Sequence, residues 1–158
     1  MEKLPAHEYL DKHGIEYEMR AFSSETEKGA ANVADALGFK ERQMIKTLIF
    51  ETGEGEQLLV MVGADQHIKS GKLKKAVGSR NIKMASPETV IEVTGYRIGS
   101  IPPFCWQPEG FRTIIEESLL EEDILGVGAG VWGNEILITP DRLLKAAKAV
   151  PFDIVQPS

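Results

Sequence analysis

The strongest constraint on the fold of this chain is a pair of apolar segments separated by a short polar one. Residues 44–50 and 57–62 are rich in β-branched and aliphatic side chains, and the six residues between them include Gly53 and Gly55. β-Branched residues favour strands, and a short loop with glycine is typical of a β-hairpin. The sequence therefore predicts a hairpin in the middle of the chain.

Lys46 lies inside the first strand of this predicted hairpin, between Ile45 and Thr47. Burying an ammonium group is costly unless a carboxylate or a ligand phosphate pairs with it. Lys46 is therefore a candidate ligand-binding residue. The alternative is a lysine on an edge strand, whose aliphatic stem packs on the sheet while its ammonium reaches water.

Helix and strand signals alternate irregularly along the rest of the chain. The expected helices cover residues 4–13, 30–37, 70–77, a segment that begins at Ser86, and 143–149. Further strands are expected at residues 15–19, 82–85, 112–115, 124–127, 135–139 and, as an edge strand, 152–155. This order predicts an α/β fold of the mixed α+β kind, in which helices flank a mixed, mostly antiparallel sheet. We expect one domain that covers residues 1–158.

The composition is that of a globular protein, with 42% hydrophobic and 27% charged residues. Cys105 is the only cysteine, which excludes an internal disulfide and suits a reducing compartment. The longest apolar run, residues 58–62, is too short to span a bilayer, and the chain does not open like a secretory signal. We therefore expect a soluble, cytoplasmic protein without a membrane partner.

The net charge of −6 conceals a basic segment. Six cations and no acid occur between residues 69 and 83, namely Lys69, Lys72, Lys74, Lys75, Arg80 and Lys83. A basic patch on an acidic body can bind one phosphate-rich ligand while the rest repels other polyanions. The alternative interpretation is a solvated helix face.

Most common catalytic motifs are missing. The histidines and the single cysteine lack zinc-site spacing, so we expect no metal. The glycines of residues 126–130 are followed by Val131 and Trp132 in place of the Lys-Ser/Thr of a phosphate-binding loop, which favours a tight turn. Cys105 has no histidine near it in sequence, so a nucleophilic role is a weak hypothesis. The adjacent Glu116 and Glu117 are weak candidates for acid–base catalysis.

A second candidate feature is the segment Gly-Ser-Ile-Pro-Pro at residues 99–103. Glycine lets the chain turn sharply and present backbone N–H groups, and the two prolines stiffen the loop. Such a rigid loop can polarise a carbonyl, as an oxyanion hole does.

In order and spacing, these segments resemble the YbaK/ProX family of tRNA-editing domains, which includes the editing insertion of bacterial prolyl-tRNA synthetases. The resemblance runs through most of the chain. It is carried by Leu37-Gly38, Ile45-Lys46-Thr47-Leu48, Lys72 in a Lys-rich helix that ends at Gly78, Met84-Ala85, Thr94-Gly95-Tyr96, the Gly-x-x-x-Pro loop from Gly99 to Pro103, the segment from Ile114 to Leu119, and Gly130, Gly133 and Ile136.

The resemblance implies hydrolysis of mischarged tRNA, typically tRNA for proline that carries alanine or cysteine, without a metal or an organic cofactor. Lys46 matches the family's essential lysine, which engages the terminal adenosine end of the tRNA. Gly99 and Ser100 match the loop whose amides hold the aminoacyl carbonyl. A substrate group, either a ribose hydroxyl or the cysteinyl thiol, takes the place of a protein nucleophile. The implied partners are the tRNA acceptor end and an aminoacyl-tRNA synthetase.

The other substrate-binding residues predicted on this pattern are Phe22, Thr47, Lys72, Ile101, Pro103, Glu116 and Gly130. Three positions depart from the family: Ser100 stands where many members have glycine, Glu116 where Asp is frequent, and Phe22 where some have Tyr. Two other functions stay open. One is a non-catalytic, editing-like module that binds tRNA or a synthetase, and the other is a hydrolase for a different small ester or amide.

Overall fold

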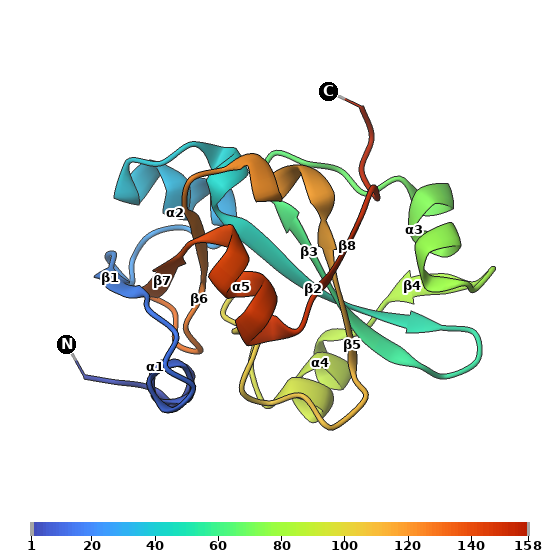
Figure 1. Cartoon of the computed structure of the whole chain (residues 1–158), viewed down its shortest axis with the longest axis horizontal. Helices are drawn as coiled ribbons and strands as arrows, with labels where there is room; N and C mark the ends of the chain where they lie inside the picture. Colours follow the sequence, from blue (N-terminus) through green and yellow to red (C-terminus); the bar gives the residue numbers. More distant parts are fainter. Residues whose placement is uncertain (1, 158) are drawn as a thin grey trace.

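Two β-sheets and five α-helices make up the part of the chain described by the computed structural model, residues 2–157 (Figure 1). The helices are α1 (Pro5–Lys12), α2 (Ala30–Leu37), α3 (Ser70–Val77), α4 (Pro87–Thr94) and α5 (Pro140–Ala147). The strands are β1 (Glu18–Ala21), β2 (Ile45–Thr52), β3 (Gln57–Gly63), β4 (Ile82–Met84), β5 (Arg112–Glu116), β6 (Leu125–Gly128), β7 (Asn134–Ile138) and β8 (Val150–Phe152).

The predicted hairpin is confirmed and forms the centre of the larger sheet. β2 and β3 pair antiparallel, from Ile45 opposite Gly63 to Glu51 opposite Gln57. This sheet has five strands in the order β4-β2-β3-β5-β8, of which β5 and β8 run parallel to their neighbours. The remaining pairings in both sheets are antiparallel, which confirms the mixed, mostly antiparallel architecture.

The strands that were expected in one sheet are divided between two. The smaller sheet has the order β1-β7-β6, and a single parallel bridge between Met44 and Gly126 links it to the start of β2. Glycine at position 126 permits this close approach, because a Cβ there would lie 2.5 Å from the Sδ and Cε atoms of Met44. Among the described residues, backbone pairing therefore joins the two sheets only where β2 begins.

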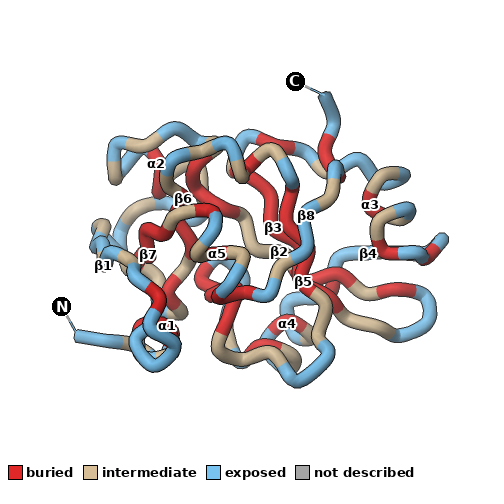
Figure 2. The backbone as a smooth tube through the Cα atoms, in the orientation of Figure 1, coloured by how far each residue is buried: buried red, intermediate tan, exposed pale blue. Residues whose placement is uncertain are grey.

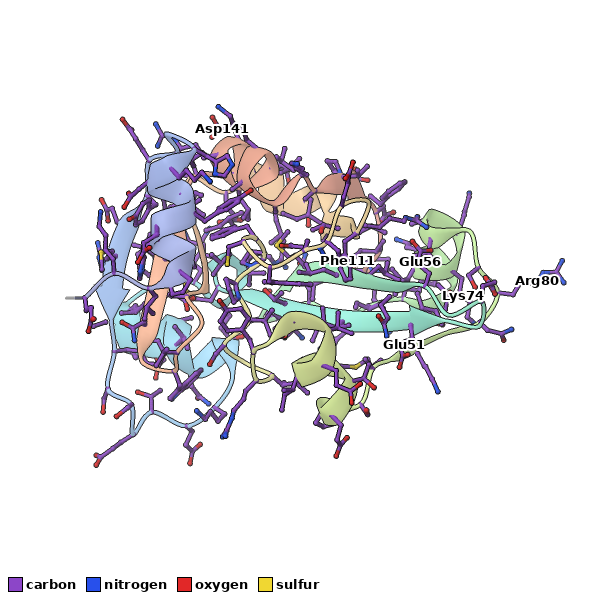
Figure 3. All side chains as sticks on the ribbon, turned by 90° about the horizontal axis from the view of Figure 1, so that it is seen from below. Glu51, Glu56, Lys74, Arg80, Phe111 and Asp141 are labelled. Carbon is purple, nitrogen blue, oxygen red and sulfur yellow. The ribbon has the colours of Figure 1, made fainter. Side chains whose placement is uncertain are left out.

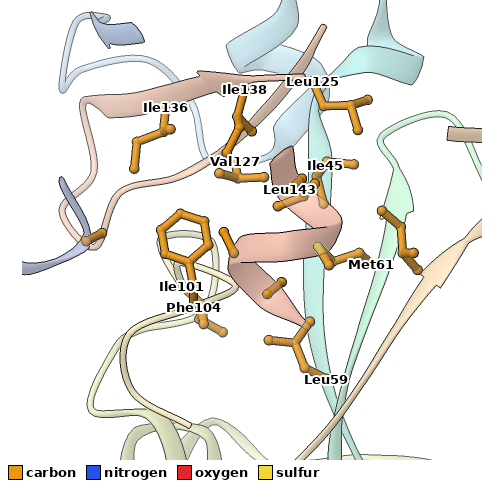
Figure 4. Packing of buried hydrophobic residues seen from close by; sticks show 14 of the residues in the cluster. Ile45, Leu59, Met61, Ile101, Phe104, Leu125, Val127, Ile136, Ile138 and Leu143 are labelled. Carbon is orange, nitrogen blue, oxygen red and sulfur yellow. The ribbon is translucent and has the colours of Figure 1, made fainter. Parts of the chain in front are cut away.

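Both faces of β3 are buried, which explains why this strand is apolar from Leu58 to Val62 (Figure 2). On one face Leu59 and Met61 pack in a cluster with Leu143 of α5, and this cluster continues into β6 and β7 (Figure 4). On the other face Val60 and Val62 pack against helix α3. The apolar side chains of β2 therefore divide between two separate cores.

The predicted ends of α2 and α3 agree with the structure. Gly38 and Gly78 end these helices in the left-handed conformation that favours glycine, and Gly95, where no helix end was predicted, ends α4 in the same way. At the start of α4, the Ser86 hydroxyl accepts a hydrogen bond from the backbone N–H of Thr89. These ends are set by local sequence, so they were accessible to prediction.

Two strand positions were predicted wrongly. The strand expected at 15–19 lies at Glu18–Ala21, because its pairing with β7 begins at Glu18 opposite Leu137. The last strand is at the sheet edge as expected, but at Val150–Phe152 and not at 152–155. Ile154 instead turns away from the sheet into the core beside α3, where its carbonyl accepts a hydrogen bond from Lys69.

Gly126→Ala is expected to lower the free energy of unfolding by about 1–3 kcal/mol, because the added methyl group overlaps the fully buried Met44. Gly71→Ala is the control. Gly71 lies within α3 with open space around its missing Cβ, so this change is expected to stabilise the protein by about 0.5–1 kcal/mol. Urea unfolding of both variants measures the difference, and equal stabilities would contradict the proposed contact between the sheets.

Candidate active site

A cavity of about 300 Å³ opens beside β2, where the two sheets diverge. β4 pairs with β2 only from Phe50 to Thr52, so the first half of β2 has β3 on one side and an open edge on the other. Side chains or backbone from Lys46, Gly99 and Glu135 line this space. We call it the β2-edge cavity. It brings together three segments that are far apart in sequence.

Lys46 is half-buried at the open edge of β2. The alternation of side chains places it on the face of the sheet that α3 covers, opposite to Ile45 and Thr47. Its Nζ atom donates a hydrogen bond of 3.0 Å to the carbonyl of Gln66. No ion pair links this ammonium to a carboxylate among the described residues, so its remaining hydrogens are available to a ligand.

Thr47 contributes polar groups to the same cavity. Its Oγ1 atom is buried and has no hydrogen-bond partner within residues 2–157. On the open side of β2, the Ile49 carbonyl accepts a hydrogen bond from the N–H of Ala85 at 2.9 Å. Alternate residues of a strand direct their backbone groups to the same side, so the N–H and C=O of Thr47 also face the open edge. The cavity therefore has a partly polar wall.

The predicted glycine bend also lines the cavity, through Gly99 and Ile101. Gly99 has φ +93°, a conformation that other L residues rarely adopt. The N–H of Ser100 donates to the carbonyl of Arg97 at 3.1 Å, and the residue is buried, so Ser100 closes the turn and is not a free donor. Gly128 of β6 lets the bend pack closely, since a Cβ there would be 3.1 Å from the Ser100 carbonyl carbon.

Glu135 in β7 is a site residue that the sequence reasoning missed. Its side chain is only 6% exposed, and its carboxyl group has no hydrogen-bond or ion-pair partner among the described residues. Burial raises the pKa of Glu135 to about 8, so the group is mostly protonated near pH 7. Glu135 is the first residue of the strand expected at 135–139, so the signal that identified Lys46, a charged residue inside an apolar strand, did not single it out.

Aromatic and cationic groups border the mouth of the cavity. Trp132 lines it, and the Nζ atom of Lys28 lies 4.2 Å from the centre of a Trp132 ring. The Trp132 indole N–H donates to the carbonyl of Thr26 at 3.1 Å. Phe22, a predicted substrate-binding residue, packs edge-on against Trp132 and does not itself line the cavity. Phe22 thus supports the wall from behind.

Four other predicted substrate-binding residues lie outside this cavity. The buried carboxylate of Glu116 accepts hydrogen bonds from the N–H groups of Ser118 and Ile154, at 2.8 and 2.9 Å. Lys72 pairs with Asp153 at 2.9 Å, and it also donates to the Val155 carbonyl. Both side chains therefore hold the segment after β8.

The other two residues, Pro103 and Gly130, contribute to packing. Pro103 is buried next to Phe104 in the main core. Gly130 makes room for Tyr96, whose Cε1 atom would lie 2.8 Å from an added Cβ. Neither contributes to the lining of the β2-edge cavity.

The remaining candidate groups give no alternative centre. Burial raises the pKa of the Cys105 thiol, which disfavours the nucleophilic thiolate. Within residues 2–157, no group of three or more His, Cys, Asp or Glu side chains is arranged to hold a metal ion. In the same range no helix has the length and apolar character needed to cross a membrane.

Comparisons with known proteins agree on one family. A family model described as "Aminoacyl-tRNA editing domain" matches residues 24–146. The chain is 26% identical over 144 residues to an Enterococcus faecalis protein named "Putative Cys-tRNA(Pro)/Cys-tRNA(Cys) deacylase EbsC", a match that covers 90% of this chain and 87% of the relative. It is 25% identical over 151 residues to a proline–tRNA ligase of Listeria welshimeri, covering 94% of this chain and 26% of the ligase. The chain thus spans about a quarter of that ligase.

Solved structures have the same fold. A protein described as "a putative trans-editing enzyme for prolyl tRNA synthetase" superposes with a TM-score of 0.87 at 25% identity, covering 99% of this chain and 100% of that one. The hypothetical protein APE2540 gives a TM-score of 0.87 at 24% identity, covering 97% of this chain and all of the other. At this level of identity, the second match supports the fold alone.

Glu135→Gln is expected to change how stability depends on pH. The pKa of Glu135 is about 8 in the folded protein and near its ordinary value of 4.5 in the unfolded chain. The folded state therefore holds the proton more tightly, so the wild type loses stability relative to the variant as the pH rises from about 4.5 to about 8. Urea unfolding across this range measures the effect, with Glu92→Gln on exposed α4 as the control. A stability difference that does not vary with pH would contradict the burial of this carboxyl group.

Proposed function

The chain belongs to the family of aminoacyl-tRNA editing domains and is an aminoacyl-tRNA deacylase, and we propose that it removes alanine or cysteine from tRNA for proline in the β2-edge cavity. One observation carries this proposal: Lys46, Gly99 and Glu135 line the same small cavity. The aminoacylated terminal nucleotide of a tRNA presents a phosphate, an ester carbonyl and the ammonium group of its amino acid. The three residues offer a partner for each.

Lys46 binds the backbone of the terminal nucleotide. One hydrogen of its ammonium group is directed at the Gln66 carbonyl, and the others can bind a phosphate or ribose oxygen at the cavity mouth. The ammonium thereby anchors the tRNA end while the acyl group enters the cavity. In this role, the binding partner is the acceptor end of the tRNA. A prolyl-tRNA synthetase is the enzyme that produces the mischarged tRNA.

The Gly99 bend binds the ester carbonyl. Its N–H, like that of Ile101, has no hydrogen-bond acceptor within the described residues, whereas the N–H of Ser100 is bonded to the Arg97 carbonyl. A donor held at this oxygen stabilises the negative charge that develops in the transition state, and one such donor contributes about 3–4 kcal/mol. The rigid bend keeps the donor in place before the substrate arrives.

Glu135 recognises the α-amino group of the aminoacyl ester. A positive charge beside a buried carboxyl group stabilises the ionised form, so substrate binding lowers the pKa of Glu135 from about 8 and releases a proton. The resulting ion pair compensates a polar group that is otherwise buried without a partner. This contact favours aminoacyl esters over esters that lack an ammonium group.

Hydrolysis needs no protein nucleophile. A water molecule attacks the ester carbonyl carbon, and the neighbouring ribose hydroxyl relays its proton to the leaving ribose oxygen. The bond between the carbonyl carbon and that oxygen then breaks, which yields a free amino acid and a free tRNA 3′ end. Ile45 and Ile101 form apolar walls that exclude large side chains by volume. Such editing adds selectivity that the aminoacylation step of the synthetase lacks, since one methylene group changes the binding free energy of an amino acid by only about 1–3 kcal/mol.

Lys46→Ala is expected to lower kcat/KM for deacylation of Ala-tRNA or Cys-tRNA for proline by about 100-fold, because the tRNA end loses its anchor. A panel of mischarged tRNAs incubated with wild type, with this variant and with Lys12→Ala on exposed α1 provides the measurement. If no aminoacyl-tRNA loses its amino acid faster than the buffer control, the enzyme assignment is wrong. Binding of tRNA without any hydrolysis would support the non-catalytic alternative.

Gly99→Ala is expected to reduce deacylation much more than Gly95→Ala does. Both glycines have positive φ, +93° and +80°, and neither has an atom within 4 Å of an added Cβ, so the backbone strain is comparable at about 1–2 kcal/mol. Only Gly99 lines the cavity. Thermal unfolding of the two variants compares the loss of stability caused by backbone strain, and kcat for deacylation compares their catalytic activity. Equal activity of the two variants would argue against a role for the bend.

A further inference from the structure

A second cavity, of about 370 Å³, lies on the α3 side of β2 and adjoins the first. The two cavities share Lys46 and Leu48 in their linings. The Lys46 ammonium is bonded to the carbonyl of Gln66, a residue that lines the second cavity. We call this space the α3-side cavity. Lys46 therefore stands at the boundary between two adjoining binding spaces.

The floor of the α3-side cavity is apolar and accessible. Leu48 contributes from β2, and Ile82 and Met84 from the same face of β4. Met84 is 54% exposed and lies on β4, the short strand at the edge of the sheet. An exposed apolar surface beside a substrate cavity is a common property of binding sites.

No acidic residue lines the α3-side cavity in the described part of the chain. Residues 66–87, which supply much of its wall and rim, contain no Asp or Glu, in a protein whose net charge is −6. His67 lines the cavity and is exposed, and so is Lys69, which follows the lining residue Ile68. The hairpin tip differs, because Lys74 and Arg80 lie there together with Glu51 and Glu56 (Figure 3). At the cavity, Lys46 and the nearby Lys69 have no acidic side chain among the lining residues.

We propose that the α3-side cavity binds the nucleotide that precedes the terminal adenosine of the tRNA. Its base lies on Leu48, Ile82 and Met84, and Lys46 pairs with the phosphate that joins it to the adenosine. This assignment rests on the proposed function, because it places the next part of the same substrate. A nucleotide fits the combination of a flat apolar floor and a cationic rim, and a methionine sulfur makes favourable contacts with aromatic rings.

The position of Lys46 allows one side chain to act in both cavities. Its stem separates the acyl group from the preceding base, and its ammonium lies where the connecting phosphate passes. Binding of a second nucleotide lengthens the contact with the tRNA beyond the terminal adenosine. It therefore distinguishes tRNA from free aminoacyl-adenosine without reading the acceptor stem.

The first test detects the nucleotide without any catalysis. The chain has five methionines, and isotope labels on their methyl groups let NMR follow Met84 separately from Met19, which lies elsewhere. Titration with the unacylated dinucleotide cytidylyl-adenosine is expected to shift the Met84 resonance upfield and saturably, while adenosine 5′-monophosphate leaves it in place. An unmoved Met84 signal at the highest dinucleotide concentration overturns the proposal, and so does an equal response to the mononucleotide.

The second test uses variants of the exposed floor. Met84→Glu is expected to lower kcat/KM on mischarged tRNA about tenfold, chiefly through KM, and to leave hydrolysis of alanyl-adenosine unchanged. Met84→Leu keeps the apolar floor and is expected to retain activity. Ile91→Glu, at an exposed apolar residue on α4, is the matched control. Equal losses on both substrates, or no loss on tRNA, overturn the proposal.

The two tests separate this proposal from the proposed function. If the wild type deacylates no aminoacyl-tRNA, the assigned reaction fails, yet the titration still decides whether the cavity binds a nucleotide. If deacylation occurs and Met84 does not respond to the dinucleotide, the reaction stands and the nucleotide assignment is wrong. Thermal unfolding of Met84→Glu verifies that this substitution at an exposed residue leaves the fold intact.

Discussion

The open edge in the first half of β2 is the constraint on which the rest of the site depends. β4 stops pairing at Phe50, and the smaller sheet bridges to the chain at Met44, so Thr47 and its neighbours have β3 on one side and no paired strand on the other. Unpaired backbone groups in a protein interior need a partner or water. The β2-edge cavity occupies this gap, and the Gly99 bend and β7 close around it.

The site retains polar groups that folding alone would not favour. Glu135 is buried without a partner, and so is the Thr47 hydroxyl, and each such group lowers the stability of the protein. Polar side chains elsewhere offset part of this cost. Glu116 and Lys72 hold the segment after β8 against β5 and α3, with direct hydrogen bonds to its backbone. Residues of similar chemistry thus line the cavity in one place and stabilise the fold in another.

Lys46 connects the two cavities because of its position on β2. Side-chain alternation places it on the α3 face, while its strand edge borders the β2-edge cavity. Its bond to the Gln66 carbonyl fixes the ammonium between the two spaces. A lysine one position away would point to the opposite face of the sheet and lose this connection.

The sequence by itself determined the hairpin and the ends of α2 and α3 at glycine, and it singled out Lys46 and Gly99 as candidates, because these features depend on local patterns. It did not single out Glu135, which begins the strand expected at 135–139. The tertiary structure alone decided the division into two sheets and the positions of the first and last strands, since these follow from partner strands distant in sequence. It also decided that Glu116 and Lys72 hold the chain terminus while Glu135 faces the cavity. Burial and contact between remote segments decide such roles, and no local pattern encodes them.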